Sequence, residues 1–288
     1  MSEMIAVIGA TGLLGGPVVR QLLEDDFAVR VLSREPIYAK EMLGMRPEYA
    51  HADVTDYESL LHGFEGCEAV HVNLGTDHEA SPDDVLHQGL VNIAKAAKEC
   101  GLQKISIITG DWKPDPDHPW ERRAAFSKGI LALEAGEVPT VNWGCTWFLE
   151  SLDYFVLPDR ALMVGMQPLT WHFVAASDYA KMVSAVMQDY DFAGHKRYTV
   201  HGPQGYKMFD ALKRYCEILR PGLPVEQMSI EETKKFAQED EENGWLEDFA
   251  EFMSNFETYG ETGDAAEAWE LLGEPMLTLE DWTKEQMP

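Results

Sequence analysis

The chain has 288 residues, 50 of them acidic and 23 basic, which gives a formal net charge of −27. This length can bury a sizeable core in one large domain or two small ones, and a surface this acidic repels nucleic acid and anionic membranes. The four cysteines follow neither a C-x-x-C nor a zinc spacing, so we expect no disulfide framework and no metal site. Without a basic, apolar leader or a long apolar run, the sequence predicts a soluble, cytoplasmic protein. A monomer and a homodimer are both left open.

The negative charge is concentrated towards the C-terminus. Residues 225–288 contain 19 acidic and 3 basic residues, a net charge of −16, whereas the first 224 residues carry −11. A solvated acidic face and adaptation to high salt would both produce an acidic chain. Because the excess of acidic residues is local rather than spread along the whole chain, the solvated acidic face is favoured.

The first 34 residues have the pattern of a dinucleotide-binding unit. The apolar run at residues 5–8 stops at Gly9, and further glycines follow at 12 and 15. Apolar residues at helical spacing come next, and then a second apolar run at residues 27–32. Strand, glycine turn, helix and strand is the beginning of a βαβ unit that binds a pyrophosphate at the helix N-terminus. In such a unit one glycine permits the tight turn, one lets the backbone approach the phosphates, and one lets helix and strand pack closely.

Beyond residue 34 the sequence continues to alternate between apolar runs and amphipathic segments. Further strands are expected at residues 49–54, 69–74, 105–108, 139–143, 170–174 and 197–201. Helices are expected at residues 37–43, 56–64, 85–97, 122–135, 177–187 and 208–219, with at least two more in the acidic tail. The alternation predicts an α/β fold, a doubly wound parallel sheet covered on both faces. We place this sheet in residues 1–150, and a smaller, mostly helical substrate region with the acidic tail in residues 151–288.

Several local features refine these expectations. Asp56 is placed to cap the helix that follows it, and Ser177 or Asp178 to cap the helix at 177–187. Three prolines make residues 111–120 an irregular loop after a strand, at the edge of the sheet where ligands bind. Tail aromatics at near-helical spacing are interpreted as core packing: Trp245, Phe249, Phe252 and Phe256.

Together these features resemble the NmrA-like group of atypical short-chain dehydrogenases/reductases, over roughly residues 4 to 220. The matching segments are GATGLLG at 9–15, Arg34, ADVTD at 52–56, residues 70–75, VAASDYA at 174–180 and YTVHGP at 198–203. Their order is more specific than any one of them. The end of the tail, from residue 271 to 282, is also similar to the way such chains end.

The resemblance implies roles for residues at three strand ends. The glycine turn would face the pyrophosphate with Gly9, Thr11, Gly12, Leu13, Leu14 and Gly15. Asp53 and Val54 would lie along the adenine, and Asn73, Leu74 and Gly75 near the ribose and nicotinamide.

Arg34 stands where an acidic residue would bind the ribose hydroxyls in an NAD-preferring site. Because a guanidinium there can pair with a 2′-phosphate, NADP(H) is favoured as cofactor and NAD(H) is the alternative. A surface arginine that ends the strand would give the same sequence.

The catalytic residues are less well defined. Typical members use Y-x-x-x-K, but Ala124 stands four residues before Lys128, so the tyrosine is missing. Lys128 would be the counterpart of the lysine that some NmrA-like reductases use, although ungapped counting places Phe126 there; an exposed helix lysine is the alternative. Thr109 or Asp111 follows the strand that in the family carries a carbonyl-polarising serine, and a plain turn residue is the alternative.

The segment after the next strand departs from the family's usual Arg-Pro-Gly-Phe-like run. Its aromatics, Trp143, Trp147 and Phe148, are expected to wall the cavity beside the nicotinamide. Cys145 is interpreted as small packing rather than a nucleophile. His172 could act as an acid or base, but a structural histidine is favoured.

The leading hypothesis is an NAD(P)H-dependent oxidoreductase acting on a small, largely apolar carbonyl or quinone-like substrate. The missing tyrosine keeps a second hypothesis open, a redox sensor that binds NAD(P) without turnover. An isomerase or lyase that uses the cofactor transiently is a third.

Overall fold

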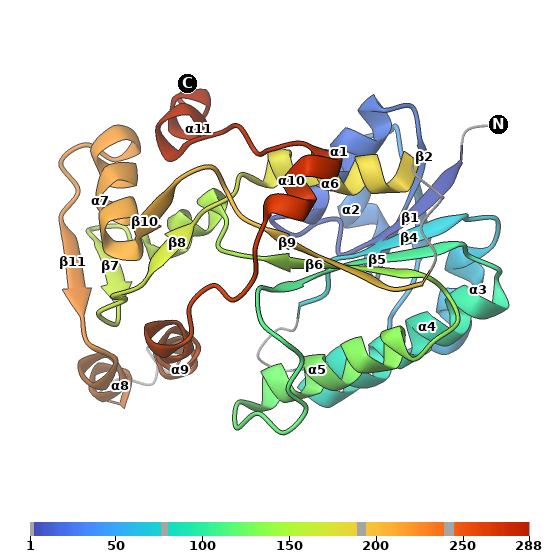
Figure 1. The fold of residues 1–288 in the computed structure, drawn as a ribbon, viewed down its shortest axis with the longest axis horizontal. Helices are drawn as coiled ribbons and strands as arrows, with labels where there is room; N and C mark the ends of the chain where they lie inside the picture. Colours follow the sequence, from blue (N-terminus) through green and yellow to red (C-terminus); the bar gives the residue numbers. More distant parts are fainter. Residues whose placement is uncertain (1–2, 76–79, 189–193, 239–244, 288) are drawn as a thin grey trace. The chain divides into compact units, whose positions relative to one another are not determined.

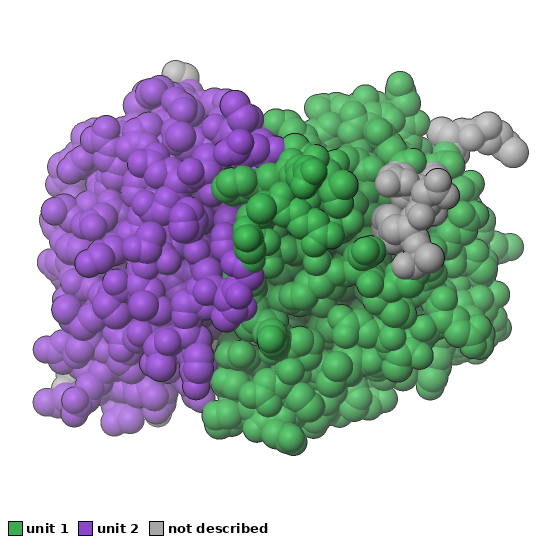
Figure 2. All heavy atoms as spheres, in the orientation of Figure 1, with its two compact units in different colours: residues 1–145, 179–200, 264–273 green, residues 146–178, 201–263, 274–288 purple. Residues whose placement is uncertain are grey.

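The structure is a computed structural model that describes residues 3–75, 80–188, 194–238 and 245–287. It divides into two compact units (Figure 2). Unit 1 consists of residues 1–145, 179–200 and 264–273, and unit 2 of residues 146–178, 201–263 and 274–288. Both units are therefore assembled from separate stretches of chain, and a division into consecutive domains at 1–150 and 151–288 stays a prediction.

Unit 1 is built on a seven-stranded sheet in the order β3-β2-β1-β4-β5-β6-β9, and all of its neighbouring pairs are parallel. Its strands are β1 Met4–Ile8, β2 Ala28–Ser33, β3 Glu48–His51, β4 Ala69–Val72, β5 Lys104–Gly110, β6 Thr140–Cys145 and β9 Lys196–Val200. The order reverses between β1 and β4, which opens a crevice beyond their carboxyl ends. The predicted doubly wound parallel sheet is confirmed.

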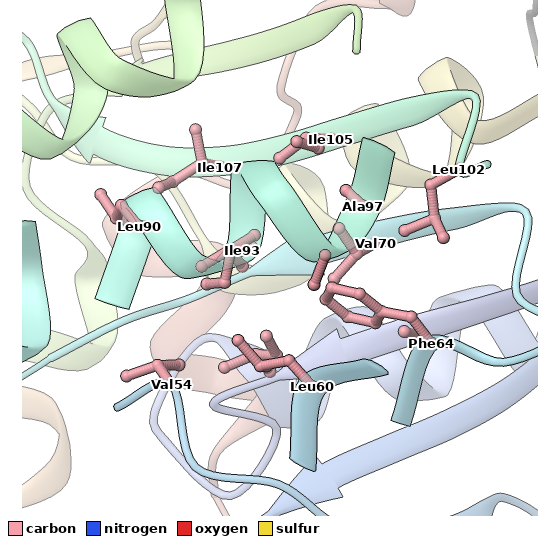
Figure 3. Packing of buried hydrophobic residues seen from close by; sticks show 14 of the residues in the cluster. Val54, Leu60, Phe64, Val70, Leu90, Ile93, Ala97, Leu102, Ile105 and Ile107 are labelled. Atoms are coloured by element: carbon pink, nitrogen blue, oxygen red, sulfur yellow. The ribbon is translucent and has the colours of Figure 1, made fainter. Parts of the chain in front are cut away.

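Helices cover both faces of this sheet. They are α1 Gly15–Glu24, α2 Pro36–Leu43, α3 Tyr57–Phe64, α4 Gly89–Glu99, α5 Glu121–Glu134, α6 Ala176–Gln188 and α10 Ala266–Leu272, with a π-helical turn η1 Asp83–Gln88 leading into α4. Helices α1 and α6 lie on one face, and α4 and α5 lie on the other (Figure 1). On the α4 side, Leu90 and Ile93 pack with Phe64 and the β5 residues Ile105 and Ile107 (Figure 3). Burying each such side chain contributes about 1.5–3 kcal/mol, so this face holds helices and sheet together.

Unit 2 has a core of its own around two small two-stranded sheets, one pairing β7 with β11 and the other β8 with β10. Its elements are η2 Leu149–Phe155, a 3₁₀ helix, β7 Ala161–Val164, β8 Thr170–His172, β10 Gly205–Lys207, α7 Met208–Leu219, β11 Val225–Met228, α8 Ile230–Gln238, α9 Trp245–Thr258 and α11 Leu279–Glu285. The predicted packing of Phe249, Phe252 and Phe256 against the core is confirmed. The side chain of Trp245 lies outside the described residues. Among the described helices, none has both the length and the apolar character needed to cross a bilayer.

The helix caps were predicted with mixed success. Asp56 caps α3 as expected, since its carboxylate accepts a hydrogen bond from the Ser59 N–H. The prediction for α6 was wrong, because this helix begins at Ala176, before both Ser177 and Asp178. The Ala176 N–H donates instead to the carboxylate of Glu150, 3.1 Å away and 26 residues earlier in the chain. Such a distant cap leaves no local signal in the sequence.

The prediction that Trp143 walls a ligand cavity was also wrong, because its side chain is fully buried in unit 1. The Trp143 indole N–H donates to Ser106 Oγ at 2.8 Å, and Ser106 Oγ is 2.9 Å from His71 Nδ1. The ring of Tyr179 packs edge-on against Trp143. Strand β6 has helices on both faces, so its side chains are buried whichever way they point.

His71 is held neutral at the centre of this network. It is fully buried, and burial lowers its pKa from 6.5 to about 3. Ser106 Oγ accepts from the Trp143 indole N–H and lies within hydrogen-bond distance of His71 Nδ1, so its hydroxyl can donate to a neutral imidazole there.

The buried histidine predicts sensitivity to acid. The unfolded chain protonates this imidazole below about pH 6.5, whereas the folded chain resists down to about pH 3, so stability is complete above pH 6.5 and falls as the pH falls. We expect the free energy of unfolding of the wild type to drop between pH 7 and pH 4 by about 3 kcal/mol more than that of His71→Asn, which can still accept from Ser106 but cannot titrate. Urea unfolding at both pH values measures this. Equal losses in the two proteins would show that His71 does not control acid stability.

Candidate functional site

A cavity of about 550 Å³ lies beyond the carboxyl ends of β1, β2 and β4, within unit 1. It occupies the point at which the strand order reverses, where ligands bind in open parallel sheets. Its lining residues come from these three strand ends, from the segment that follows β3, and from the elements after them. They are Ile8, Gly9, Ala10, Thr11, Leu32, Ser33, Arg34, Glu35, Tyr38, Ala52, Asp53, Val54, Asn73, Leu74, Gly75, Ala80 and Val85.

Gly9 is the residue at which β1 meets the end of β4. The Asn73 N–H donates to the Ile8 carbonyl at 3.0 Å, which brings the two chain segments together. Gly9 has a φ of +75°, and a Cβ there would lie 1.8 Å from the carbonyl oxygen of Asn73. Any side chain would therefore force the strand ends apart, so glycine is required at this position.

The other two glycines of the turn differ in what surrounds them. A Cβ on Gly15 would lie 2.2 Å from the Gly9 carbonyl oxygen, so Gly15 lets α1 approach the turn. A Cβ on Gly12 would come no nearer than 3.4 Å to that same oxygen, which is ordinary contact. The fold therefore needs glycine at 9 and 15, whereas at Gly12 the absence of a side chain leaves space for a ligand to approach the backbone.

The N-terminus of α1 is prepared for an anion. No side chain caps this helix, and its first turn contains no acidic residue. Of the first N–H groups of the helix, those of Gly16 and Val18 donate to the Gly12 and Leu14 carbonyls at 3.4 Å, and Pro17 has none. What the helix directs towards the turn of residues 9–15 is therefore the positive end of its dipole, without a carboxylate to neutralise it. A phosphate group fits this arrangement.

The end of β2 supplies the cavity's positive charge. Arg34 is exposed there, in a short turn held by two contacts. The Glu35 N–H donates to Ser33 Oγ at 3.0 Å, and His51 Nδ1 lies 3.1 Å from the Arg34 carbonyl oxygen. Tyr38, which was not among the predicted binding residues, also lines the cavity from the first turn of α2. An aromatic residue just after this turn is the signal that could have identified it.

Asp53 and Val54 form a fixed wall of the cavity. The Asp53 carboxylate accepts from both the N–H and the hydroxyl of Thr55 at 2.8 Å. The carbonyl of Val54 accepts from the Asn92 side chain at 2.9 Å. The wall is thus held by hydrogen bonds that need no ligand, and it presents the nearly buried side chain of Val54.

The predicted binding residues fall into two groups. Thr11, Gly9, Arg34 and the segments 53–54 and 73–75 line one cavity. Gly12, Leu13, Leu14 and Gly15 continue the same turn but are not among the residues that line it. A cofactor contact for any of them stays a prediction.

The two predicted catalytic residues do not line the cavity. Lys128 is exposed on α5. Thr109 is nearly buried at the end of β5, and its hydroxyl lies 2.6 Å from Asn142 Oδ1 and 3.1 Å from the Trp143 carbonyl oxygen. To polarise a substrate carbonyl, this hydroxyl would first have to leave those acceptors. Both roles stay predictions.

Cys145, at the end of β6, is buried, and burial raises the pKa of its thiol well above the usual range. A neutral, inaccessible thiol is a poor nucleophile. This supports the interpretation of Cys145 as a packing residue.

Comparison with known proteins is consistent with a phosphate-containing ligand. Residues 9–133 match the family model described as NAD(P)H-binding. The chain is 29% identical over 242 residues to the NmrA-like family domain-containing oxidoreductase hkm9 of Aspergillus hancockii, covering 73% of this chain and 70% of that protein. It is 25% identical over 209 residues to quinone oxidoreductase 2 of Escherichia coli, covering 70% of this chain and 66% of that one.

Solved structures share the whole fold. The triphenylmethane reductase of Citrobacter, solved in complex with NADP(H), superimposes with a TM-score of 0.77 over 100% of both chains at 19% sequence identity. Because the sequence identity is low, this likeness shows the fold alone.

The contrast between the glycines yields a test of the site. Gly12→Val should abolish NADPH binding, measured by calorimetry, because its side chain would occupy the approach to the turn, while a Cβ at this position makes only ordinary contacts with the protein. Gly15→Ala is the matched contrast, expected to lower the free energy of unfolding by about 3 kcal/mol through overlap with the Gly9 carbonyl. If Gly12→Val kept the wild-type affinity, the turn would not be the phosphate site.

Proposed function

We propose that this chain, a member of the NmrA-like group of atypical short-chain dehydrogenases/reductases, is an NAD(P)H-dependent oxidoreductase that reduces a small, largely apolar carbonyl or quinone-like substrate. The carrying observation is the cavity where β1, β2 and β4 end, with its glycine turn, uncapped helix and Arg34. Relatives named as oxidoreductases and a quinone reductase support the reaction class.

NADP(H) is the proposed cofactor. The glycine turn and the N-terminus of α1 would hold the pyrophosphate, and Arg34 would hold the 2′-phosphate at the end of β2. Asp53 and Val54 would flank the adenine, while Asn73, Leu74 and Gly75 would lie nearer the nicotinamide. The donor types fit the group, since phosphates meet N–H groups and a guanidinium, and the base meets the apolar side chain of Val54.

In the proposed reaction the nicotinamide supplies a hydride, and the residues of the chain bind and orient the cofactor and the substrate. Lys128 is the proposed source of positive charge or of a proton, and Thr109 the proposed carbonyl partner. Reduction of a quinone or an activated carbonyl places less demand on a proton donor than reduction of a plain ketone, because the product anion is delocalised. This choice of substrate class is consistent with the missing tyrosine.

The alternative function is a redox sensor that binds NAD(P) and signals without turnover. What favours it is the state of the two catalytic candidates, one an exposed lysine and the other a hydroxyl already in contact with Asn142. Both functions use the same cavity, so cofactor binding alone does not separate them.

Turnover separates the two functions. We expect purified protein, mixed with NADPH and a panel of quinones and aldehydes, to consume NADPH. The loss of NADPH absorbance measures this consumption. Lys128→Ala should lower kcat if Lys128 acts in the reaction, with Lys98→Ala, another exposed helix lysine, as the matched control. Tight NADPH binding with no consumption across the panel would contradict the reductase function and support the redox sensor.

The preference between NADPH and NADH tests the proposed role of Arg34. Arg34→Asp should weaken NADPH binding by roughly 10- to 100-fold and shift preference towards NADH, because a charge-assisted pair is replaced by repulsion. Lys40→Asp on α2 makes the same change of charge outside the cavity lining and controls for the overall field. The ratio of the two dissociation constants, by calorimetry, is the measurement. An unchanged ratio in Arg34→Asp would remove this residue from the phosphate site.

A further inference from the structure

The strongest unassigned group of polar side chains lies in unit 2. His172, His201 and Glu261 each offer one ligand atom, and these atoms all lie within 4.8 Å of one another. They come from three separate places: the end of β8, the residue after β9, and the loop after α9. None belongs to the cavity described above.

Backbone contacts bring the two histidines together. The Gly202 N–H donates to the His172 carbonyl at 2.9 Å, so the chain at His201 runs beside the end of β8. The two imidazole rings stack with centroids 5.5 Å apart and planes within 13°. Gly205 lies opposite His172 in the β8–β10 pair, and a Cβ there would come 3.0 Å from His172 Nε2. Glycine at 205 thus leaves room for the ring.

Glu261 is fixed in place by the protein. Its Oε1 accepts from the Thr146 hydroxyl and from the His172 N–H at 2.6 Å. Its Oε2 lies 2.7 Å from His172 Nδ1, so one carboxylate oxygen anchors the residue and the other faces the imidazole. The Glu261 side chain is only 10% exposed, whereas that of His172 is 40% exposed. The group is therefore rigid on the carboxylate side and open on the imidazole side.

We propose that His172, His201 and Glu261 bind a divalent transition-metal ion, with Zn²⁺ as the best match. Two imidazoles and one carboxylate are a known zinc ligand set, with the fourth position left to water or a ligand. The ion replaces the proton between His172 Nδ1 and Glu261 Oε2. Tetrahedral ligands at zinc bond lengths sit roughly 3.3 Å apart, so this pair opens slightly, while His201 turns out of its stack and moves inward.

Such an ion would link three chain segments that are distant in sequence. Each ligand is a residue that the fold of unit 2 already holds close to the other two, so binding requires side-chain rotation rather than refolding. A ligand that binds only the folded state stabilises it. The site is therefore expected to raise thermal stability, whatever reaction the chain performs.

Binding of the metal alone tests the proposal without any cofactor or substrate. The full chain, dialysed against a chelator, is titrated with ZnCl₂ by calorimetry, and with Co²⁺ to follow the visible absorption of a four-coordinate site. We expect about one ion per chain with a dissociation constant in the micromolar range or tighter. At a hundredfold excess over that constant, Zn²⁺ should raise Tm by roughly 5 °C.

Three variants complete the test. His201→Ala and Glu261→Gln should each weaken Zn²⁺ binding by at least about 100-fold and remove the Co²⁺ absorption. His62→Ala, at an exposed histidine on α3, should leave both unchanged. Because Glu261 also anchors backbone, His201→Ala decides the outcome if Glu261→Gln fails to fold. No saturable binding, or binding that His201→Ala leaves intact, would overturn the site.

Discussion

The architecture of unit 1 depends on the close approach of Gly9 to the end of β4. A Cβ at this position would lie 1.8 Å from the Asn73 carbonyl oxygen, so only a bare backbone allows β1 to turn away beside β4. Gly15 then packs on the Gly9 carbonyl, which sets the start of α1. One contact between backbones thus fixes the glycine turn, the N-terminus of the helix and one wall of the cavity. Asn73 and Leu74, which line the cavity, take their positions from it.

Features encoded locally were predictable, and features that depend on distant residues were not. The glycine spacing, the Asp56 cap and the alternation of strands and helices are each written in adjacent residues, and the structure contains them. The α6 cap depends on Glu150, 26 residues away, and the β7–β11 pair joins segments about 60 residues apart. The burial of Trp143 depends on helices covering both faces of β6, which the sequence pattern of one strand cannot reveal. The glycine turn that borders the cavity was predictable because it is a local motif, whereas the catalytic candidates Thr109 and Lys128 lie on different elements.

The two catalytic candidates explain why the reaction is harder to infer than the cofactor. A carbonyl reductase needs a donor that is free to face the substrate. Thr109 is in contact with Asn142 and the Trp143 carbonyl, and the buried Ser106 is occupied by His71 and Trp143. These polar groups stabilise the inner sheet by satisfying one another. This arrangement is the reason why the proposed substrate is one whose reduced form needs no strong proton donor.

The acidic charge of the chain bears on how it can hold an anionic cofactor. With a net charge of −27, the overall field opposes a dinucleotide phosphate. That field is screened beyond roughly 8 Å at physiological ionic strength, so nearby groups decide the affinity. Most of the excess lies in residues 225–288, of which all but 264–273 belong to unit 2, while the first turn of α1 in unit 1 carries no carboxylate. The positive end of the α1 dipole and Arg34 can therefore attract phosphate locally.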